Sequence, residues 1–153
     1  MSTLFDKIIN NQIPSFKVYE DQDYLAFLTP FPNTKGLTIV IPKINPGAYL
    51  FDLNDDTYLG LLLISKKIAK ALEKALEVER VAMVVEGTGV AHVHVKLYPL
   101  FGITKEETNV WSTHQEYYPN YAGYLTTVEG PKMSDQELEE VKTKIKEVLE
   151  NEG

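Results

Sequence analysis

The sequence predicts an α+β fold in which a sheet of about five strands carries one long helix on one face. Two observations predict it: short runs of β-branched and aromatic residues separated by turn residues, and one long stretch with helical periodicity. The length of 153 residues fits one domain with its own core. We therefore expect a single domain over 1–153, with its core in 1–101 and an aromatic-rich extension in 102–153 that ends in a helix.

The N-terminal elements follow from capping and turn residues. Ser2 or Thr3 can cap a short helix, which ends before Pro14 because the residue preceding a proline disfavours helical geometry. Segments 16–20 and 23–28 have the composition of strands and flank a polar turn, so they predict two strands around that turn.

The middle of the chain predicts a central strand, a long helix and a second buried strand. Segment 37–41 is almost continuously apolar, as expected of a strand that is buried on both faces. Asn54 or Asp55 caps the helix, and segment 81–85 forms the next buried strand. The helix places apolar residues at three- and four-residue intervals: Leu61, Ile64, Ile68, Leu72 and Leu76.

The C-terminal third is rich in aromatic residues. We expect it to pack over the sheet, because so many aromatic side chains are costly to leave in water. Ser134 and Glu137 have the spacing of a capping box, which predicts a final helix whose apolar stripe packs on its own domain or, as the alternative, on a second subunit. His114 is interpreted as a surface histidine. The aromatic residues are Tyr98, Trp111, Tyr117, Tyr118, Tyr121 and Tyr124.

Composition argues against several classes of function. The formal net charge of −7 opposes docking on a nucleic acid polymer or an anionic membrane, but it does not exclude a small anionic ligand. No apolar run approaches the ~18 residues that a membrane span needs. The absence of cysteine excludes disulfides, thiolate nucleophiles and cysteine-based zinc sites. The N-terminus lacks the layout of a secretory signal, so we expect a cytoplasmic protein. We also expect no metal and no other cofactor.

The pattern that carries chemistry is His92-Val93-His94-Val95-Lys96. Side chains alternate along a strand, so we expect His92, His94 and Lys96 to share one face and the valines to share the other. Neutral imidazole is a nucleophile, a general base and a metal ligand near neutral pH. The preceding segment, Glu86-Gly87-Thr88-Gly89, predicts a tight turn whose backbone N–H groups can approach an anion.

Three interpretations of the two histidines compete. A zinc site lacks a third clear ligand, and Lys96 would repel a cation. Two satisfied structural histidines are the ordinary alternative, but two of the three histidines in the chain stand in phase. Phosphate binding also accounts for the lysine, since an ammonium is a point charge for phosphate oxygens. We favour phosphate binding, with Glu86 as a general base, a ribose acceptor or simply a turn residue.

The segment from His92 to Pro99 resembles the signature strand of the histidine-triad (HIT) proteins, with lysine in place of the third histidine. This pattern resembles a bacterial and archaeal sub-branch of that family. The resemblance covers roughly the first two thirds of the chain and implies an antiparallel sheet and a homodimer. Further segments resemble the family's opening helix, its first strands and the segment around its Ile-Pro-Lys sequence: 5–9, 13–14, 18–21, 25–28, 32–36 and 39–43.

The resemblance implies nucleotide binding and attack on an α-phosphate. His94 would be the nucleophile and form a nucleotidyl-histidine intermediate that water hydrolyses, and His92 would orient it largely through its backbone carbonyl. The implied substrate is a nucleoside phosphoramidate, a dinucleoside polyphosphate or a similar nucleotide-derived molecule. Besides Lys96 as the third catalytic residue, the candidate nucleotide-binding residues are Phe5, Ile8, Phe27, Thr29, Glu86, Gly87, Thr88 and Gly89.

The chain also departs from the family pattern. Leu37 and Asn45 replace further histidines, and Thr29 replaces an aspartate that usually binds ribose hydroxyls. The connection 86–91 is shorter than usual and lacks the polar residue that typically contacts the phosphate and the leaving group. A nucleotide-binding regulatory module with little or no turnover is therefore the alternative function. A structural or interaction protein, built on the aromatic extension and the final helix, is the third hypothesis.

Overall fold

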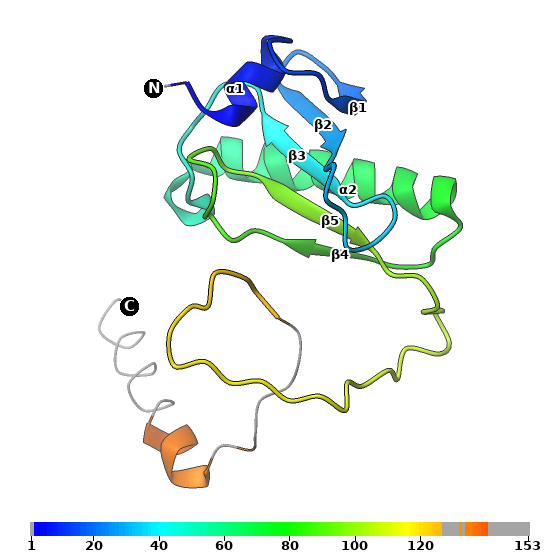
Figure 1. Ribbon diagram of the computed structural model, residues 1–153, viewed down its shortest axis with the longest axis vertical. Coiled ribbons are helices and arrows are strands. Elements are labelled where there is room, and N and C mark those ends of the chain that lie inside the picture. Colours follow the sequence, from blue (N-terminus) through cyan, green and yellow to red (C-terminus); the bar gives the residue numbers. More distant parts are fainter. Residues whose placement is uncertain (1, 127–131, 133, 141–153) are drawn as a thin grey trace. The chain divides into compact units, whose positions relative to one another are not determined.

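The computed structural model describes residues 2–126, 132 and 134–140, and it divides the chain into two units, 1–110 and 111–153. All the labelled helices and strands belong to the first unit (Figure 1). The organisation expected from the sequence, one domain with its core in 1–101, stays a prediction.

The strands form one five-stranded antiparallel sheet, in the order β1-β2-β3-β5-β4. β3 is the central strand, as the apolar segment predicted, and Val40 on β3 pairs with Ala26 on β2 and Val95 on β5. The predicted fold class is thereby confirmed. The strands are β1 (Phe16–Glu20), β2 (Tyr24–Leu28), β3 (Thr38–Pro42), β4 (Val81–Val84) and β5 (Val95–Pro99).

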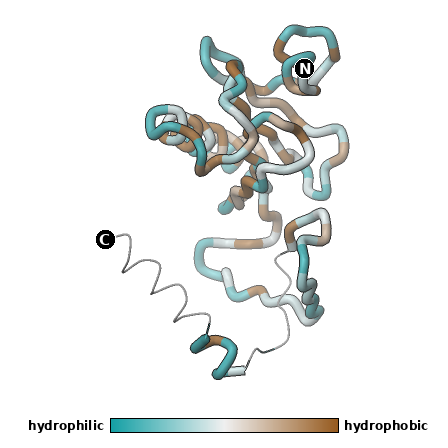
Figure 2. The backbone as a smooth tube through the Cα atoms, turned by 90° about the vertical axis from the view of Figure 1, so that its left-hand side faces the viewer, coloured by the Kyte–Doolittle hydropathy of each residue, from teal (hydrophilic) through white to brown (hydrophobic). Residues whose placement is uncertain are grey.

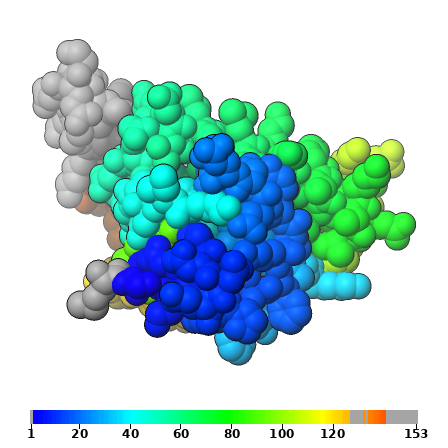
Figure 3. Space-filling view, turned by 90° about the horizontal axis from the view of Figure 1, so that it is seen from above, coloured from blue at the N-terminus to red at the C-terminus, as the bar shows by residue number. Residues whose placement is uncertain are grey.

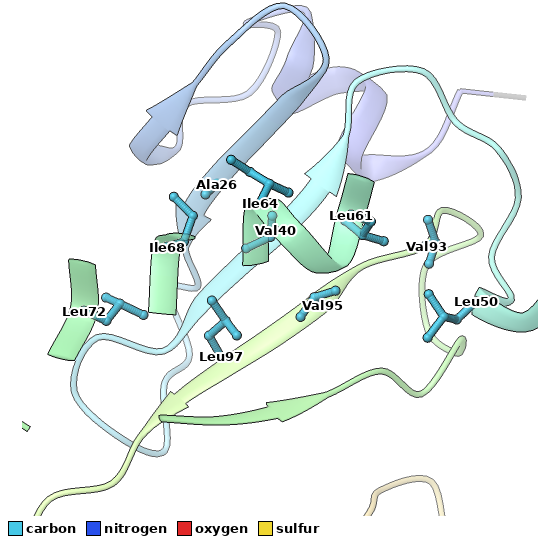
Figure 4. Packing of buried hydrophobic residues seen from close by; sticks show 10 residues of the cluster. All are labelled: Ala26, Val40, Leu50, Leu61, Ile64, Ile68, Leu72, Val93, Val95 and Leu97. Atoms are coloured by element: carbon cyan, nitrogen blue, oxygen red, sulfur yellow. The ribbon is translucent and has the colours of Figure 1, made fainter. Parts of the chain in front are cut away.

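The long helix α2 (Asp55–Leu76) covers one face of the sheet (Figure 1). Asn54 is its cap, because the Asn54 side chain accepts a hydrogen bond from the backbone N–H of Thr57. The predicted apolar stripe of α2 is buried from Leu61 to Leu72 against alternate residues of the strands (Figure 4), and Leu76 is only partly buried. The cluster consists of Ala26, Val40, Leu50, Leu61, Ile64, Ile68, Leu72, Val93, Val95 and Leu97.

The short helix α1 (Leu4–Ile9) packs on the other set of alternate strand residues, and it lies at the surface in dark blue in Figure 3. Thr3 caps it in a complete capping box with Asp6. Since successive strand residues point to opposite faces, α1 and α2 bury opposite faces of the sheet. The α1 cluster consists of Phe5, Ile8, Leu25, Phe27 and Ile41.

Two sequence predictions need correction. The segment predicted as the strand 81–85 is β4, an edge strand that is only partly buried and exposes Met83, because β5 is its only neighbour in the sheet. His92 and His94 precede β5 instead of lying within it. The reason is that the backbone N–H groups there bond to loop carbonyls: His92 to Val90 at 2.8 Å, and Val93 to Gly47 at 2.7 Å.

In the second unit, the capping box predicted at Ser134 is present, with the Ser134 hydroxyl donating to the Glu137 carboxylate over 2.6 Å. A helical turn follows over 135–140. Of the apolar stripe predicted for this helix, Leu138 is described and exposed. The rest of the stripe, Val141, Ile145, Val148 and Leu149, lies outside the described residues. The aromatic residues from Trp111 to Tyr124 are exposed, and packing of this segment over the sheet stays a prediction.

Hydropathy along the backbone follows the two layers of the first unit: hydrophobic residues recur through the sheet and along α2, and hydrophilic residues lie in many of the connecting loops (Figure 2). Among the described helices, none is both long enough and apolar enough to cross a bilayer.

The α1 cluster provides a matched test of core burial. Ile41 is 0% exposed in β3, and Ile44 in the following loop is 84% exposed. We expect Ile41→Ala to lower the free energy of unfolding by about 2–5 kcal/mol, because it removes transfer energy and leaves a cavity. Ile44→Ala should change it by less than about 0.5 kcal/mol. Urea unfolding followed by circular dichroism measures both values, and equal destabilisation by the two variants would contradict this description of the core.

Candidate functional site

The histidine segment is held by the loop that follows β3. The Nε2 atom of His92 lies 2.7 Å from the carbonyl oxygen of Pro42, and the backbone N–H of Val93 donates to the carbonyl of Gly47. The side-chain amide of Asn45 donates to the carbonyl of Ala91 over 2.9 Å. These three hydrogen bonds fix the backbone on which both imidazoles are carried.

His94 presents a free ring nitrogen. Its Nδ1 lies 2.9 Å from the backbone carbonyl oxygen of His92, and a carbonyl can only accept, so Nδ1 carries the proton. In the neutral ring Nε2 therefore has a lone pair. Among the described residues Nε2 has no hydrogen-bond partner and is not a buried atom, although His94 is only 5% exposed. This is the tautomer that a nucleophilic imidazole requires.

His92 is completely buried, and its two ring nitrogens differ. Nε2 donates to the Pro42 carbonyl, whereas Nδ1 has no hydrogen-bond partner among the described residues. The nearest carboxylate oxygen is Oδ1 of Asp6, at 3.9 Å. Burial lowers the pKa of His92 below 6.5, while the Pro42 carbonyl and the Asp6 carboxylate act in the opposite direction.

The two imidazoles and Lys96 lie on the α1 side of the sheet. The ring of Phe5 makes edge contacts with both, at centroid distances of 5.7 Å to His92 and 5.1 Å to His94. Lys96 pairs in register with Ile39, which packs against the α1 cluster, so its side chain leaves the sheet on the same side. The alternation expected from the sequence is therefore kept, even though the histidines precede the strand.

The Lys96 ammonium forms an ion pair with Glu86. The Glu86 side chain is largely buried, and both charges act on the nearby His94. Burial lowers the pKa of His94 below 6.5, and the Lys96 charge lowers it further, against the opposing effects of the His92 carbonyl and Glu86. The imidazole of His94 therefore stays neutral at pH values where an exposed histidine is already protonated.

A cavity of about 340 Å³ lies between α1 and the ends of β1 and β2. It brings together four of the predicted nucleotide-binding residues: Phe5, Ile8, Phe27 and Thr29. The Thr29 hydroxyl accepts a hydrogen bond from the Phe31 backbone N–H over 3.2 Å. The two histidines and the 86–89 turn do not line this cavity, but Phe5 contacts both the histidines and the cavity.

The turn from Glu86 to Gly89 has the backbone geometry that its glycines allow. Gly87 has φ +71° and Gly89 has φ +84°, both in the left-handed region that favours glycine. A Cβ on Gly87 would also lie 3.3 Å from the Ala48 carbonyl oxygen, so this turn packs closely on the loop that precedes α2. Within the described part of the chain, no group of three or more His, Cys, Asp or Glu residues comes together that could hold a metal ion.

Sequence reasoning missed the contributions of Asp6, Pro42 and Asn45. Asp6 could be recognised only as part of a helix start, because its spacing from Thr3 is that of a cap. Asn45 could be recognised only as a replaced histidine. The Pro42 acceptor is a backbone atom, for which a sequence carries no residue-specific signal.

Comparison with known proteins identifies the family to which this chain is related. The HIT domain profile matches residues 10–102. The chain is 34% identical to the protein named Hit of Bacillus subtilis, over 75% of this chain and 82% of the relative. It is 40% identical to the adenosine 5′-monophosphoramidase HNT1 of Saccharomyces cerevisiae over 46% of this chain and 44% of the relative.

A solved structure shows the same fold. The crystal structure of a HIT family member from Bacillus subtilis superimposes with a TM-score of 0.64 and 26% identity, covering 96% of each chain. The profile match spans the sheet, most of α1's contact partners and the histidine segment. This chain therefore belongs to the HIT family.

Proposed function

We propose that this protein is a nucleotidyl hydrolase or transferase that attacks an α-phosphate through Nε2 of His94. The observation that carries the proposal is the Nδ1–H···O=C bond between His94 and His92, because it leaves a lone pair on Nε2. A nucleoside phosphoramidate is the favoured substrate class and a dinucleoside polyphosphate the second. Support comes from the Saccharomyces cerevisiae relative, which is named an adenosine 5′-monophosphoramidase.

The reaction proceeds in two displacements. The Nε2 lone pair forms a bond to the α-phosphorus, and the bond from phosphorus to the leaving amine or phosphate breaks, with the electron pair leaving on that group, which takes a proton from solvent. Water then attacks the phosphorus of nucleotidyl-His94 and loses a proton to solvent, the P–N bond breaks, and its electron pair returns to Nε2. Transfer to another acceptor in place of water gives the transferase outcome.

Lys96 supplies positive charge for the phosphate oxygens, and Glu86 holds its ammonium in place. The turn 86–89 contributes backbone N–H groups close to the same face. His92 orients His94 through its carbonyl. With these roles the three residues of the His-x-His-x-Lys pattern each perform a different task.

The nucleoside occupies the apolar cavity. Phe5, Ile8 and Phe27 offer flat and aliphatic surfaces on which a base can stack, and Thr29 lies at the same cavity with a hydroxyl for a ribose oxygen. Because Phe5 also touches His94, a nucleoside in this cavity has its phosphate on the side of the nucleophile.

Nucleotide binding with little or no turnover is the second candidate function. It is favoured by the ion pair between Lys96 and Glu86, because an ammonium already paired with a carboxylate has less charge to offer a phosphate. Calorimetry that detects tight nucleotide binding, together with the absence of hydrolysis over hours, would select this candidate.

We further propose a cytoplasmic homodimer. The exposed large apolar side chains of α2 and of the turn before it, together called the apolar patch, are Tyr49, Phe51, Leu59 and Leu63. A second copy of the chain would cover it. The absence of cysteine is compatible with a reducing compartment.

The first prediction concerns the nucleophile. His94→Ala should reduce hydrolysis of adenosine 5′-phosphoramidate by roughly three orders of magnitude or more, because the covalent route is removed. Mass spectrometry of acid-sensitive adducts in the unmodified protein should detect adenylate on His94. His114→Ala is the matched control, because His114 is exposed in the second unit, and it should leave turnover unchanged. Full turnover in His94→Ala would refute the mechanism.

The second prediction concerns pH. Because the pKa of His94 lies below 6.5, kcat/KM should stay constant as pH falls through 6.5 and decline only at lower pH, when His94 becomes protonated. Lys96→Gln should move this decline to higher pH, because it removes the positive charge that lowers the pKa of His94. Initial rates between about pH 4.5 and 8.5, roughly two units on either side of the pKa of a free imidazole, measure the decline in both proteins. A decline that already begins above pH 7 in the unmodified protein would contradict the assignment.

The third prediction concerns assembly. Leu63 is 66% exposed on α2. Leu63→Glu should convert a dimer to a monomer in light scattering coupled to gel filtration, because it places a charge in the apolar patch. Lys35→Glu, a charge change at an exposed residue in the loop before β3, lies outside the apolar patch and should leave the dimer intact. A monomeric unmodified protein at micromolar concentration would exclude the homodimer.

A further inference from the structure

Within the described part of the chain, the buried imidazole of His92 has acceptors around it and no hydrogen-bond donor. Its Nε2 donates to the Pro42 carbonyl. The nearest carboxylate oxygen to Nδ1 is Oδ1 of Asp6, at 3.9 Å. Nδ1 has no hydrogen-bond partner among the described residues. In the neutral ring Nδ1 is a lone pair facing an anion, whereas in the imidazolium it is an N–H facing an acceptor. The Asp6 carboxylate therefore stabilises a proton on Nδ1, against the larger opposite effect of burial.

The Asp6 carboxylate is held in this place by the start of α1. Its other oxygen, Oδ2, accepts from the Thr3 backbone N–H over 2.6 Å and from the Thr3 hydroxyl over 2.8 Å. The Asp6 backbone N–H in turn donates to the Thr3 hydroxyl oxygen over 3.1 Å. One oxygen thus serves the capping box, and the second is left to face His92.

His92 connects Asp6 to the nucleophile. The carbonyl oxygen of His92 is the acceptor that fixes the Nδ1–H of His94, so the position of His92 sets the direction of the His94 lone pair. Phe5, the residue before Asp6, contacts both imidazoles from the same helix. Helix α1 therefore contacts both imidazoles through the Phe5 ring and places the Asp6 carboxylate near His92.

We propose that Asp6 is a positioning residue for His94: its carboxylate holds the buried imidazole of His92, and the carbonyl of His92 holds the nucleophile in its reactive orientation. The kinetic part of this inference rests on the proposed function, whereas the coupling between Asp6 and His92 does not. The site residues expected from the sequence on α1 were Phe5 and Ile8, and Asp6 was not among them.

Electrostatics support the coupling. Burial lowers the pKa of His92, and Asp6 and the Pro42 carbonyl counteract it, while the neighbouring His94 disfavours a second positive charge. Reciprocally, His92 contributes to the lowered pKa of Asp6, after the larger effect of the Thr3 hydrogen bonds. Asp6 from α1, the Pro42 carbonyl from β3 and His94 from its own segment are the groups that act on His92 in the described residues.

Asp6→Asn is the decisive variant, because the amide keeps the size of the side chain and a carbonyl oxygen for the capping box while it removes the charge. In the unliganded full-length protein, nitrogen-15 NMR of the imidazoles should show that the pKa of His92 falls further than in the unmodified protein. With adenosine 5′-phosphoramidate, kcat should fall about tenfold because the nucleophile is less well oriented, with KM changed by less than about twofold. Asp6→Glu restores a carboxylate and should recover part of both losses.

Thr3→Ala is the matched control. It removes the Thr3 hydroxyl from the capping box and should lower the melting temperature. Asp6 keeps its charge, and Oδ2 keeps the hydrogen bond from the backbone N–H of residue 3, so the pKa of His92 and kcat should change little. If Asp6→Asn leaves the pKa of His92 unchanged, or if Thr3→Ala reproduces both effects of Asp6→Asn, the inference is overturned and Asp6 is only a helix cap. Failure of the unmodified protein to turn over any nucleotide would refute the proposed function, and the NMR titration would still decide the coupling.

Discussion

Two hydrogen bonds from imidazole to backbone carbonyl are the constraint on which the site depends. One joins the His92 ring to the carbonyl of Pro42 at the end of β3. The other joins the His94 ring to the carbonyl of His92. Each bond fixes which nitrogen carries the proton, and therefore where the free lone pair of His94 is. The central sheet matters to function because the pairing of β3 with β5 sets the distance between these segments.

One face of the sheet carries the hydrophobic core under α2, and the other carries the candidate functional site. Val93, Val95 and Leu97 belong to the core beneath α2, while the residues between them point to the α1 side, where the imidazoles meet Phe5. A substitution in the α2 core changes the stability of the scaffold, and one on the α1 side changes the site itself. Helix α1 is short, and its stability comes from its cap and from Phe5 and Ile8, so the histidine face and the N-terminus depend on the same contacts.

Periodicity and turn residues predicted most of the fold. The strand 16–20 was predicted with its observed bounds, and the helix stripe from Leu61 to Leu72 is buried as expected, because these signals depend on local spacing. The exposed edge position of β4 was not predictable, because an apolar run does not reveal how many neighbours its strand has in the sheet. The irregular backbone at His92 was also missed, because it depends on acceptors in the loop around Gly47, about 45 residues away in sequence.

The lysine in the third position of the His-x-His-x-Lys pattern makes the charge around His94 nearly balanced. Lys96 and Glu86 act on the pKa of His94 in opposite directions, and Glu86 is largely buried beside the ammonium. A phosphate that approaches His94 must therefore compete with a carboxylate for Lys96, and the net charge of −7 gives it no long-range attraction. In the proposed reaction, discrimination for a nucleotide over inorganic phosphate then has to come from the nucleoside, whose base would enter the apolar cavity at Phe5 and Phe27. Binding energy from the base would bring the α-phosphate of the proposed substrate to His94, where the electrostatic field alone would not attract an anion.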